Sequence, residues 1–182
     1  MKELAEKPLR RQKIYDGCIL HVVRDTALLP NGKEATREVV LHPGAVAVVP
    51  LDRDGCVYME KQYRYPMEHV IDEIPAGKMD PGENPDEAAR RELAEETGLR
   101  AGKWTYLGLF YPSPAILGEK IHLYLAEELE EGDTDPDEDE FLEVERVPFD
   151  EMVRRVTAGE IPDGKTQCAI LRVWHHLHGK TV

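Results

Sequence analysis

Residues 77–99 constrain the fold more than any other part of this chain, because helix start and stop signals surround a group of acids there. Asn84 is a favourable N-cap, and Pro85 suits the first position of a helix. Glu87 stands where a capping box has its acid, and Gly98 suits the left-handed residue that ends a helix. The segment therefore predicts a helix between Asn84 and Gly98.

This helix brings several carboxylates together. Glu92, Glu95 and Glu96 are spaced i, i+3 and i+4, so they share one patch, and Glu83 lies in the loop ahead of it. Ala89, four residues before Leu93, predicts a core-facing side opposite the acids. At ~4 Å and an effective dielectric constant near 20, each pair of carboxylates costs up to about 4 kcal/mol before solvent relief.

That repulsion needs an opposing charge. Arg91 satisfies one carboxylate, but Arg90 and Arg91 together do not neutralise the whole set. A hard divalent cation does, and all-oxygen ligands select Mg²⁺, Mn²⁺ or Ca²⁺ over zinc. The alternative from spacing alone is a solvated acidic helix face without a ligand.

The rest of the chain alternates strands and helices without a strict βαβ repeat. Residues 1–42 are predicted to form a β-rich arm with a hairpin turn at Asn31–Gly32, and residues 43–182 a second domain. Further strands are predicted at 45–51, 56–65, 103–111, 120–129 and 141–149, and helices at 150–160 and 165–179. We therefore expect an α+β fold with a mixed sheet covered by helices.

Charge and composition exclude several classes of protein. The chain has 36 acids against 23 bases, a net charge of −13, and no evident basic patch for nucleic acid. No apolar run approaches the ~20 residues of a membrane span. The three cysteines are far apart, which favours a reducing compartment, and we expect the cytoplasm. A phosphorylated substrate needs cations or placed arginines to offset the negative field.

The pattern of residues 77–99 is similar to that of a known family. Gly77-x5-Glu83-x7-Arg91-Glu92-Leu93-x-Glu95-Glu96-x-Gly98-Leu99 resembles the Nudix box at every fixed position. The resemblance implies the Nudix fold, and hydrolysis of a nucleoside diphosphate linked to another group. It also implies a requirement for Mg²⁺, with Mn²⁺ as a substitute.

The same resemblance implies roles for particular residues. Arg91 would orient the glutamates and, with Glu95, belong to the catalytic residues. The implied metal ligands are the backbone carbonyl of Ala76 and the carboxylates of Glu92, Glu95 and Glu96, with Glu83 in support.

Outside the box, the chain is similar to the ADP-ribose pyrophosphatase subgroup. The matching segments are 37–38, 42–46, 61–64, 73–77, 113–114 and 137–140. This similarity implies cleavage of ADP-ribose to AMP and ribose 5-phosphate by a homodimer with swapped arms. Ala115 departs from the subgroup, which usually has glycine after Ser-Pro, and its methyl group stiffens the loop before Glu119.

The subgroup also implies substrate contacts. Glu119 would be the general base or an additional metal contact, and Arg64 would bind the phosphates. Arg37 or Glu38 would recognise the adenosine end across the dimer interface, and Glu73 would hold the terminal ribose or the shape of the site.

Other interpretations stay open at this point. An arginine on a strand, such as Arg37 or Arg64, often makes a surface ion pair or covers apolar surface, and Glu119 alone is an ordinary loop acid. The substrate could instead be another nucleoside diphosphate sugar, such as a GDP-hexose. The remaining alternatives are a non-catalytic ADP-ribose sensor and a structural acidic protein without a ligand.

Overall fold

The computed structural model describes residues 4–132 and 141–179. Within them the chain forms two compact units. The N-terminal unit runs up to Gly44 and includes Tyr111–Lys120, and the helical unit comprises Ala45–Phe110 and the chain from Ile121 onward. No described helix is both long enough and apolar enough to cross a membrane.

The N-terminal unit contains a three-stranded antiparallel sheet in the order β1-β2-β3, as expected for the β-rich arm. Its strands are β1 (Lys7–Asp16), β2 (His21–Leu28) and β3 (Glu34–Leu41). The β2–β3 turn has Gly32 at a φ of 80°, a conformation that favours glycine. Val23, Asp25 and Ala27 of β2 are buried, whereas every residue of β1 is exposed.

The helical unit contains two sheets, where the sequence predicted one. The mixed sheet has the order β7-β4-β9-β8, and β4 and β9 run parallel to each other. Its strands are β4 (Ala45–Pro50), β7 (Ala76–Lys78), β8 (Leu99–Phe110) and β9 (Ile121–Glu131). The antiparallel sheet, of order β10-β5-β6, contains β5 (Cys56–Arg64), β6 (His69–Glu73) and β10 (Leu142–Pro148), and the short 3₁₀ helix η1 (Tyr65–Met67) joins β5 to β6.

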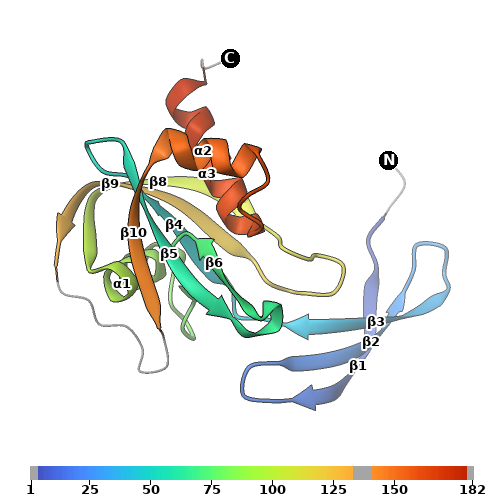
Figure 1. Ribbon diagram of the computed structural model, residues 1–182. Helices are drawn as coiled ribbons and strands as arrows, with labels where there is room; N and C mark the ends of the chain where they lie inside the picture. The colour runs from blue at the N-terminus through green and yellow to red at the C-terminus, as the bar shows by residue number, and fades with distance from the viewer. Residues whose placement is uncertain (1–3, 133–140, 180–182) are drawn as a thin grey trace. The chain divides into compact units, whose positions relative to one another are not determined.

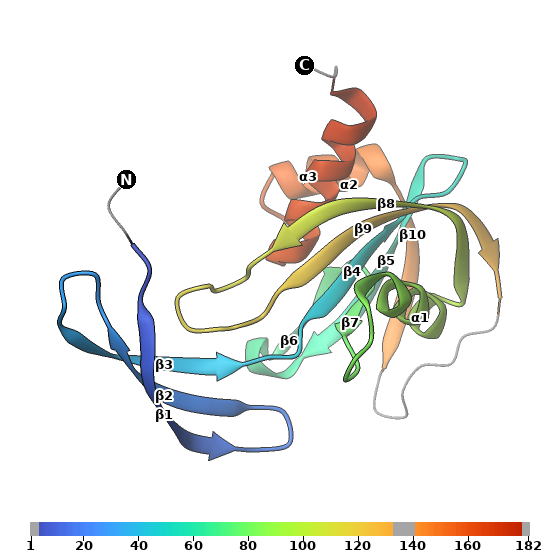
Figure 2. The same cartoon turned by 180° about the vertical axis from the view of Figure 1, so that it is seen from behind.

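Strand β4 is buried on both faces, which explains its continuous apolar sequence. Val46 and Val48 belong to one core cluster with α1 (Pro85–Thr97). Ala47 and Val49 belong to the other, with α2 (Phe149–Thr157) and α3 (Gly164–His178). Helices therefore cover both sides of the sheets, as Figures 1 and 2 show, and the predicted α+β class is confirmed.

The predicted ends of α1 are confirmed. The side-chain Oδ1 of Asn84 accepts a hydrogen bond of 2.9 Å from the backbone N–H of Glu87. Gly98 has a φ of 69° and donates its N–H to Ala94 at 2.9 Å. Ala89 and Leu93 are fully buried, as their spacing predicted. These local signals fix where the helix begins and where it ends.

Candidate functional site

Strand β7 and helix α1 bring two glutamates into close contact with backbone. Oε2 of Glu96 accepts the N–H of Ala76 at 2.9 Å. A Cβ atom on Gly77 would lie 2.1 Å from the carboxylate of Glu92, so any other residue here would displace that carboxylate. Glu92 and Glu96 are 8% and 6% exposed. The alternative of a solvated acidic face is therefore wrong for these two residues.

Arg91 gathers the remaining acids of the box. Its guanidinium donates to Glu83 in two hydrogen bonds of 2.9 Å, to Glu92 at 2.9 Å and to Glu95 at 2.8 Å. A further bond of 3.0 Å reaches the carbonyl of Lys78 on β7. The pKa of Arg91 is raised, mainly by the hydrogen bond to Glu83 and then by Glu95 and Glu92. Burial of the guanidinium lowers it, but by less. The contact with Arg91 lowers the pKa of Glu83.

One arginine therefore offsets the carboxylate repulsion that the sequence predicted. Within residues 4–132 and 141–179, no three His, Cys, Asp or Glu side chains stand together as a ready metal cage, and the Arg91 guanidinium lies against three of the four box glutamates. The donor chemistry nevertheless fits a hard divalent cation, because carboxylates and backbone carbonyls supply only oxygen. The space that Gly77 leaves for Glu92 supports the same fit.

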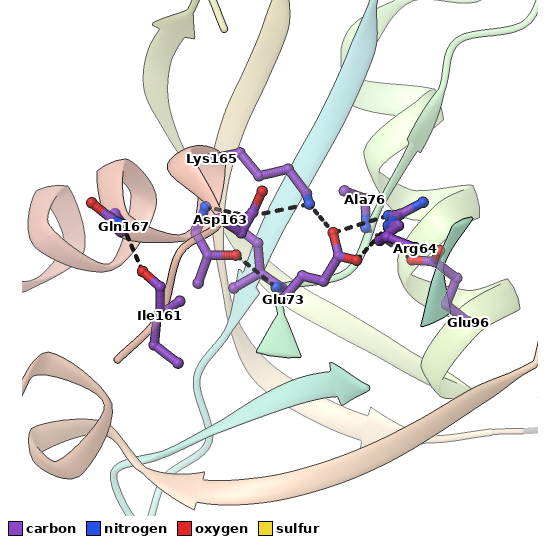
Figure 3. A network of polar contacts seen from close by, with 10 residues as sticks. Arg64, Glu73, Ala76, Glu96, Ile161, Asp163, Lys165 and Gln167 are labelled. Carbon is purple, nitrogen blue, oxygen red and sulfur yellow. Dashed lines mark hydrogen bonds and ion pairs between the residues drawn. The ribbon is translucent and has the colours of Figure 1, made fainter. Parts of the chain in front are cut away.

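A second polar network lies beside this cluster (Figure 3). The buried carboxylate of Glu73, at the end of β6, accepts from Nε of Arg64 at 2.5 Å and from Nη2 at 2.9 Å. Lys165 also donates to Glu73, and reaches Asp163, the N-cap of α3, at 3.2 Å. Burial lowers the pKa of Arg64, but the bond to Glu73 outweighs it, aided by Asp163 and Glu96. The negative charge of Glu96 therefore acts on the Arg64 guanidinium, and the Arg64 side chain is 41% exposed.

The other predicted residues lie in the N-terminal unit. Arg37 pairs with Glu6 at 2.6 Å and Glu38 with Arg24 at 2.8 Å, all on the sheet of this unit or next to it. Glu119 lies in the loop 111–120, with its Oε1 3.7 Å from Nε2 of His42. Their roles toward a substrate stay predictions. The matching segment 137–140 lies outside the described residues.

Sequence reasoning missed Lys165. It is 9% exposed although it carries a charge, and it meets Glu73 across 92 positions of sequence. One signal was present. Lys165 falls in the first turn of a helix, where the helix dipole disfavours cations, so a lysine there indicates a specific acidic partner.

Comparisons with known proteins show which family the chain resembles over most of its length. The NUDIX domain model matches residues 41–166, which include both networks. An ADP-ribose pyrophosphatase of Bacillus subtilis (strain 168) is 45% identical over 172 residues, 93% of this chain and 93% of that protein. A methanol dehydrogenase activator of Bacillus methanolicus is 40% identical over 171 residues, 93% of this chain and 92% of that protein. A crystal structure of an ADP compounds hydrolase matches with a TM-score of 0.84 and 26% identity, covering 100% of both chains.

Proposed function

This chain belongs to the Nudix family, and from that premise we propose that it hydrolyses ADP-ribose to AMP and ribose 5-phosphate. The observation that carries the proposal is the burial of Glu92 and Glu96 against Ala76 and Gly77 of β7. Two buried carboxylates against the backbone of β7 favour a bound cation, and a diphosphate is a ligand that such a cation attracts to an acidic protein.

Mg²⁺ is the proposed cofactor, and Mn²⁺ can replace it. Glu92, Glu95, Glu96 and the carbonyl of Ala76 hold it, with Glu83 in support. When bound, the cation offsets the charge that develops on the diphosphate and lowers the pKa of a bound water. Arg91 keeps the glutamates oriented, because it already contacts Glu83, Glu92 and Glu95.

Arg64 is the proposed phosphate ligand of the helical unit. Glu73 holds its Nε and Nη2 in a two-point contact, which fixes the plane of the guanidinium. The Glu73 carboxylate also pairs with Lys165, so its single negative charge does not fully neutralise the positive charge of Arg64. In this proposal the main role of Glu73 is to hold the Arg64 guanidinium in place, which sets the shape of the site.

Glu119 is the proposed general base, and Arg37 or Glu38 is proposed to recognise the adenosine end from a second subunit. We propose a homodimer because β1 is an edge strand whose apolar residues Leu9, Ile14 and Tyr15 are exposed. Light scattering at micromolar concentration measures the oligomeric state directly, and a monomer contradicts the proposed dimer.

The three cysteines are all free thiols, which agrees with action in the reducing cytoplasm.

The proposed activity predicts a clear substrate ranking. With Mg²⁺, the purified protein should release AMP from ADP-ribose with a kcat/KM at least about tenfold above that for GDP-mannose, a difference of about 1.4 kcal/mol in transition-state binding. Chelation with EDTA should abolish hydrolysis, and Mg²⁺ should restore it. Phosphate-bond cleavage is measured by separating the nucleotide products.

The alternatives give different outcomes in these kinetics, in a binding measurement or in a thermal melt. A higher kcat/KM for GDP-mannose would assign the protein to another nucleoside diphosphate sugar. Binding of ADP-ribose without cleavage would indicate a sensor. A thermal midpoint that neither Mg²⁺ nor ADP-ribose raises would indicate a protein without this ligand.

A further inference from the structure

The loop 111–120 is fastened to the end of β3 immediately before Glu119. The backbone N–H of Val40 donates to the carbonyl of Ile116 at 2.8 Å, and the N–H of Gly118 donates to the carbonyl of Val40 at 2.9 Å. A Cβ atom on Gly118 would lie 3.4 Å from the Val40 oxygen, so loop and strand backbones run close together. The loop segment before Glu119 is therefore held by Val40, near the end of β3.

His42, the residue that follows β3, lies close to the Glu119 carboxylate. Nδ1 of His42 accepts the backbone N–H of Gly44 at 3.1 Å. Because an amide N–H only donates, Nδ1 carries no proton, and the ring proton resides on Nε2. Nε2 is the atom that lies 3.7 Å from Oε1 of Glu119, and the two side chains are only 17% and 19% exposed.

We propose that His42 is a positioning residue, whose Nε2–H holds Oε1 of Glu119 so that the other carboxylate oxygen has a fixed direction. The inference rests on the proposed role of Glu119 as base. The distance of 3.7 Å is longer than a hydrogen bond, but such contacts often tighten only when substrate binds. A neutral donor orients the carboxylate and leaves its negative charge available to accept the proton of the attacking water.

The contact with Gly44 distinguishes this arrangement from a simple ion pair. A doubly protonated ring would turn an N–H toward the N–H of Gly44 and lose that hydrogen bond. The tautomer is thus selected by backbone, in the way that the second ring nitrogen of a histidine generally fixes the role of the first.

Two substitutions separate the two sides of the ring. His42→Asn places an amide oxygen near the position of Nδ1, which keeps an acceptor for Gly44 and removes the donor toward Glu119. His42→Gln places its amide nitrogen near the position of Nε2 and restores that donor. We expect His42→Asn to lower kcat by about 10- to 100-fold with little change in KM, and His42→Gln to recover most of the loss.

A double-mutant cycle tests whether His42 acts through Glu119. If it does, adding His42→Asn to Glu119→Gln should lower kcat no further than Glu119→Gln alone. The proposal would be overturned if the kcat losses of His42→Asn and Glu119→Gln multiplied in the double variant. It would also be overturned if His42→Asn and His42→Gln lowered kcat equally at unchanged thermal midpoints. Each of these would assign His42 a structural role only.

Nitrogen NMR of the wild-type imidazole gives a readout that does not need activity. The His42 ring should show an unprotonated Nδ1 and a protonated Nε2, and its Nε2 signal should shift in Glu119→Gln. The resonance missing from His42→Asn identifies it. A proton on Nδ1 contradicts the proposal even if the enzyme is active. Lack of hydrolysis of every diphosphate, with the expected ring signals, contradicts only the proposed function.

Discussion

Replacing Glu96 with glutamine should lower kcat for ADP-ribose hydrolysis by at least about a hundredfold, the size of effect seen when a group that stabilises transition-state charge is removed. The amide oxygen of the new side chain can still accept the N–H of Ala76, which Glu96 accepts at 2.9 Å. The fold should therefore persist while one negative charge of the proposed cation site is lost. Steady-state kinetics at saturating Mg²⁺, together with thermal unfolding, measures both effects.

Glu87→Gln is the matched control for Glu96→Gln. It makes the same chemical change on the same helix, but Glu87 is exposed in the first turn of α1. It should retain wild-type kcat. Wild-type turnover in Glu96→Gln would remove Glu96 from the metal assignment, and an equal loss in both variants would attribute the effect to helix charge.

Replacing Glu73 with glutamine should destabilise the protein by about 3 kcal/mol, at the lower end of the range for breaking a buried ion pair, because one of its two cations remains partly solvated. The Glu73 side chain is 3% exposed, and those of Lys165 and Arg64 are 11% and 41% exposed. An amide can turn an oxygen to only one of the two cations. Urea unfolding should show a lower midpoint with an unchanged slope.

Glu145→Gln is the control for Glu73→Gln. It removes the partner of Lys61 on the neighbouring strand, where both side chains are about one-third exposed or more. A solvent-exposed ion pair contributes roughly 0–1 kcal/mol, so this change should have little effect. Equal midpoints for Glu73→Gln and wild type would mean that the buried network does not stabilise the fold.

The helix and its surroundings were largely predictable, because their signals are local. Asn84 and Gly98 mark the ends of α1 by capping chemistry that depends on a few neighbouring residues. The hairpin at Gly32 and the apolar strand 45–51 were also predictable from a few neighbouring residues. A single-sequence pattern carries such information directly.

Burial of the glutamates was not predictable from spacing. The i, i+3, i+4 pattern places Glu92, Glu95 and Glu96 on one side of a helix, but not against a strand. Strand β7, only three residues long, covers Glu92 and Glu96 and leaves the side chain of Glu95 38% exposed. Gly77 and Glu92 meet across the loop before α1, and that contact depends on tertiary packing.

The contacts of the second network could not be predicted from the sequence for the same reason, because they depend on tertiary packing. Arg64 and Glu73 lie on paired strands, but the register places Arg64 opposite His69 and not opposite Glu73, so strand pairing alone does not bring the two together. Lys165 reaches the same carboxylate from α3, across 92 positions, and no periodicity links the two. The contact between His42 and Glu119 likewise depends on the course of the loop 111–120.

Anomalous diffraction from crystals soaked in Mn²⁺ with a non-hydrolysable ADP-ribose analogue shows directly whether the buried glutamates of α1 bind a divalent cation. We expect anomalous peaks among Glu92, Glu96 and the carbonyl of Ala76, within coordination distance of their oxygens. Arg91 should then give up part of its present contacts with Glu92 and Glu95. An analogue bound with no anomalous peak at these glutamates would show that Glu92 and Glu96 do not form the cation site.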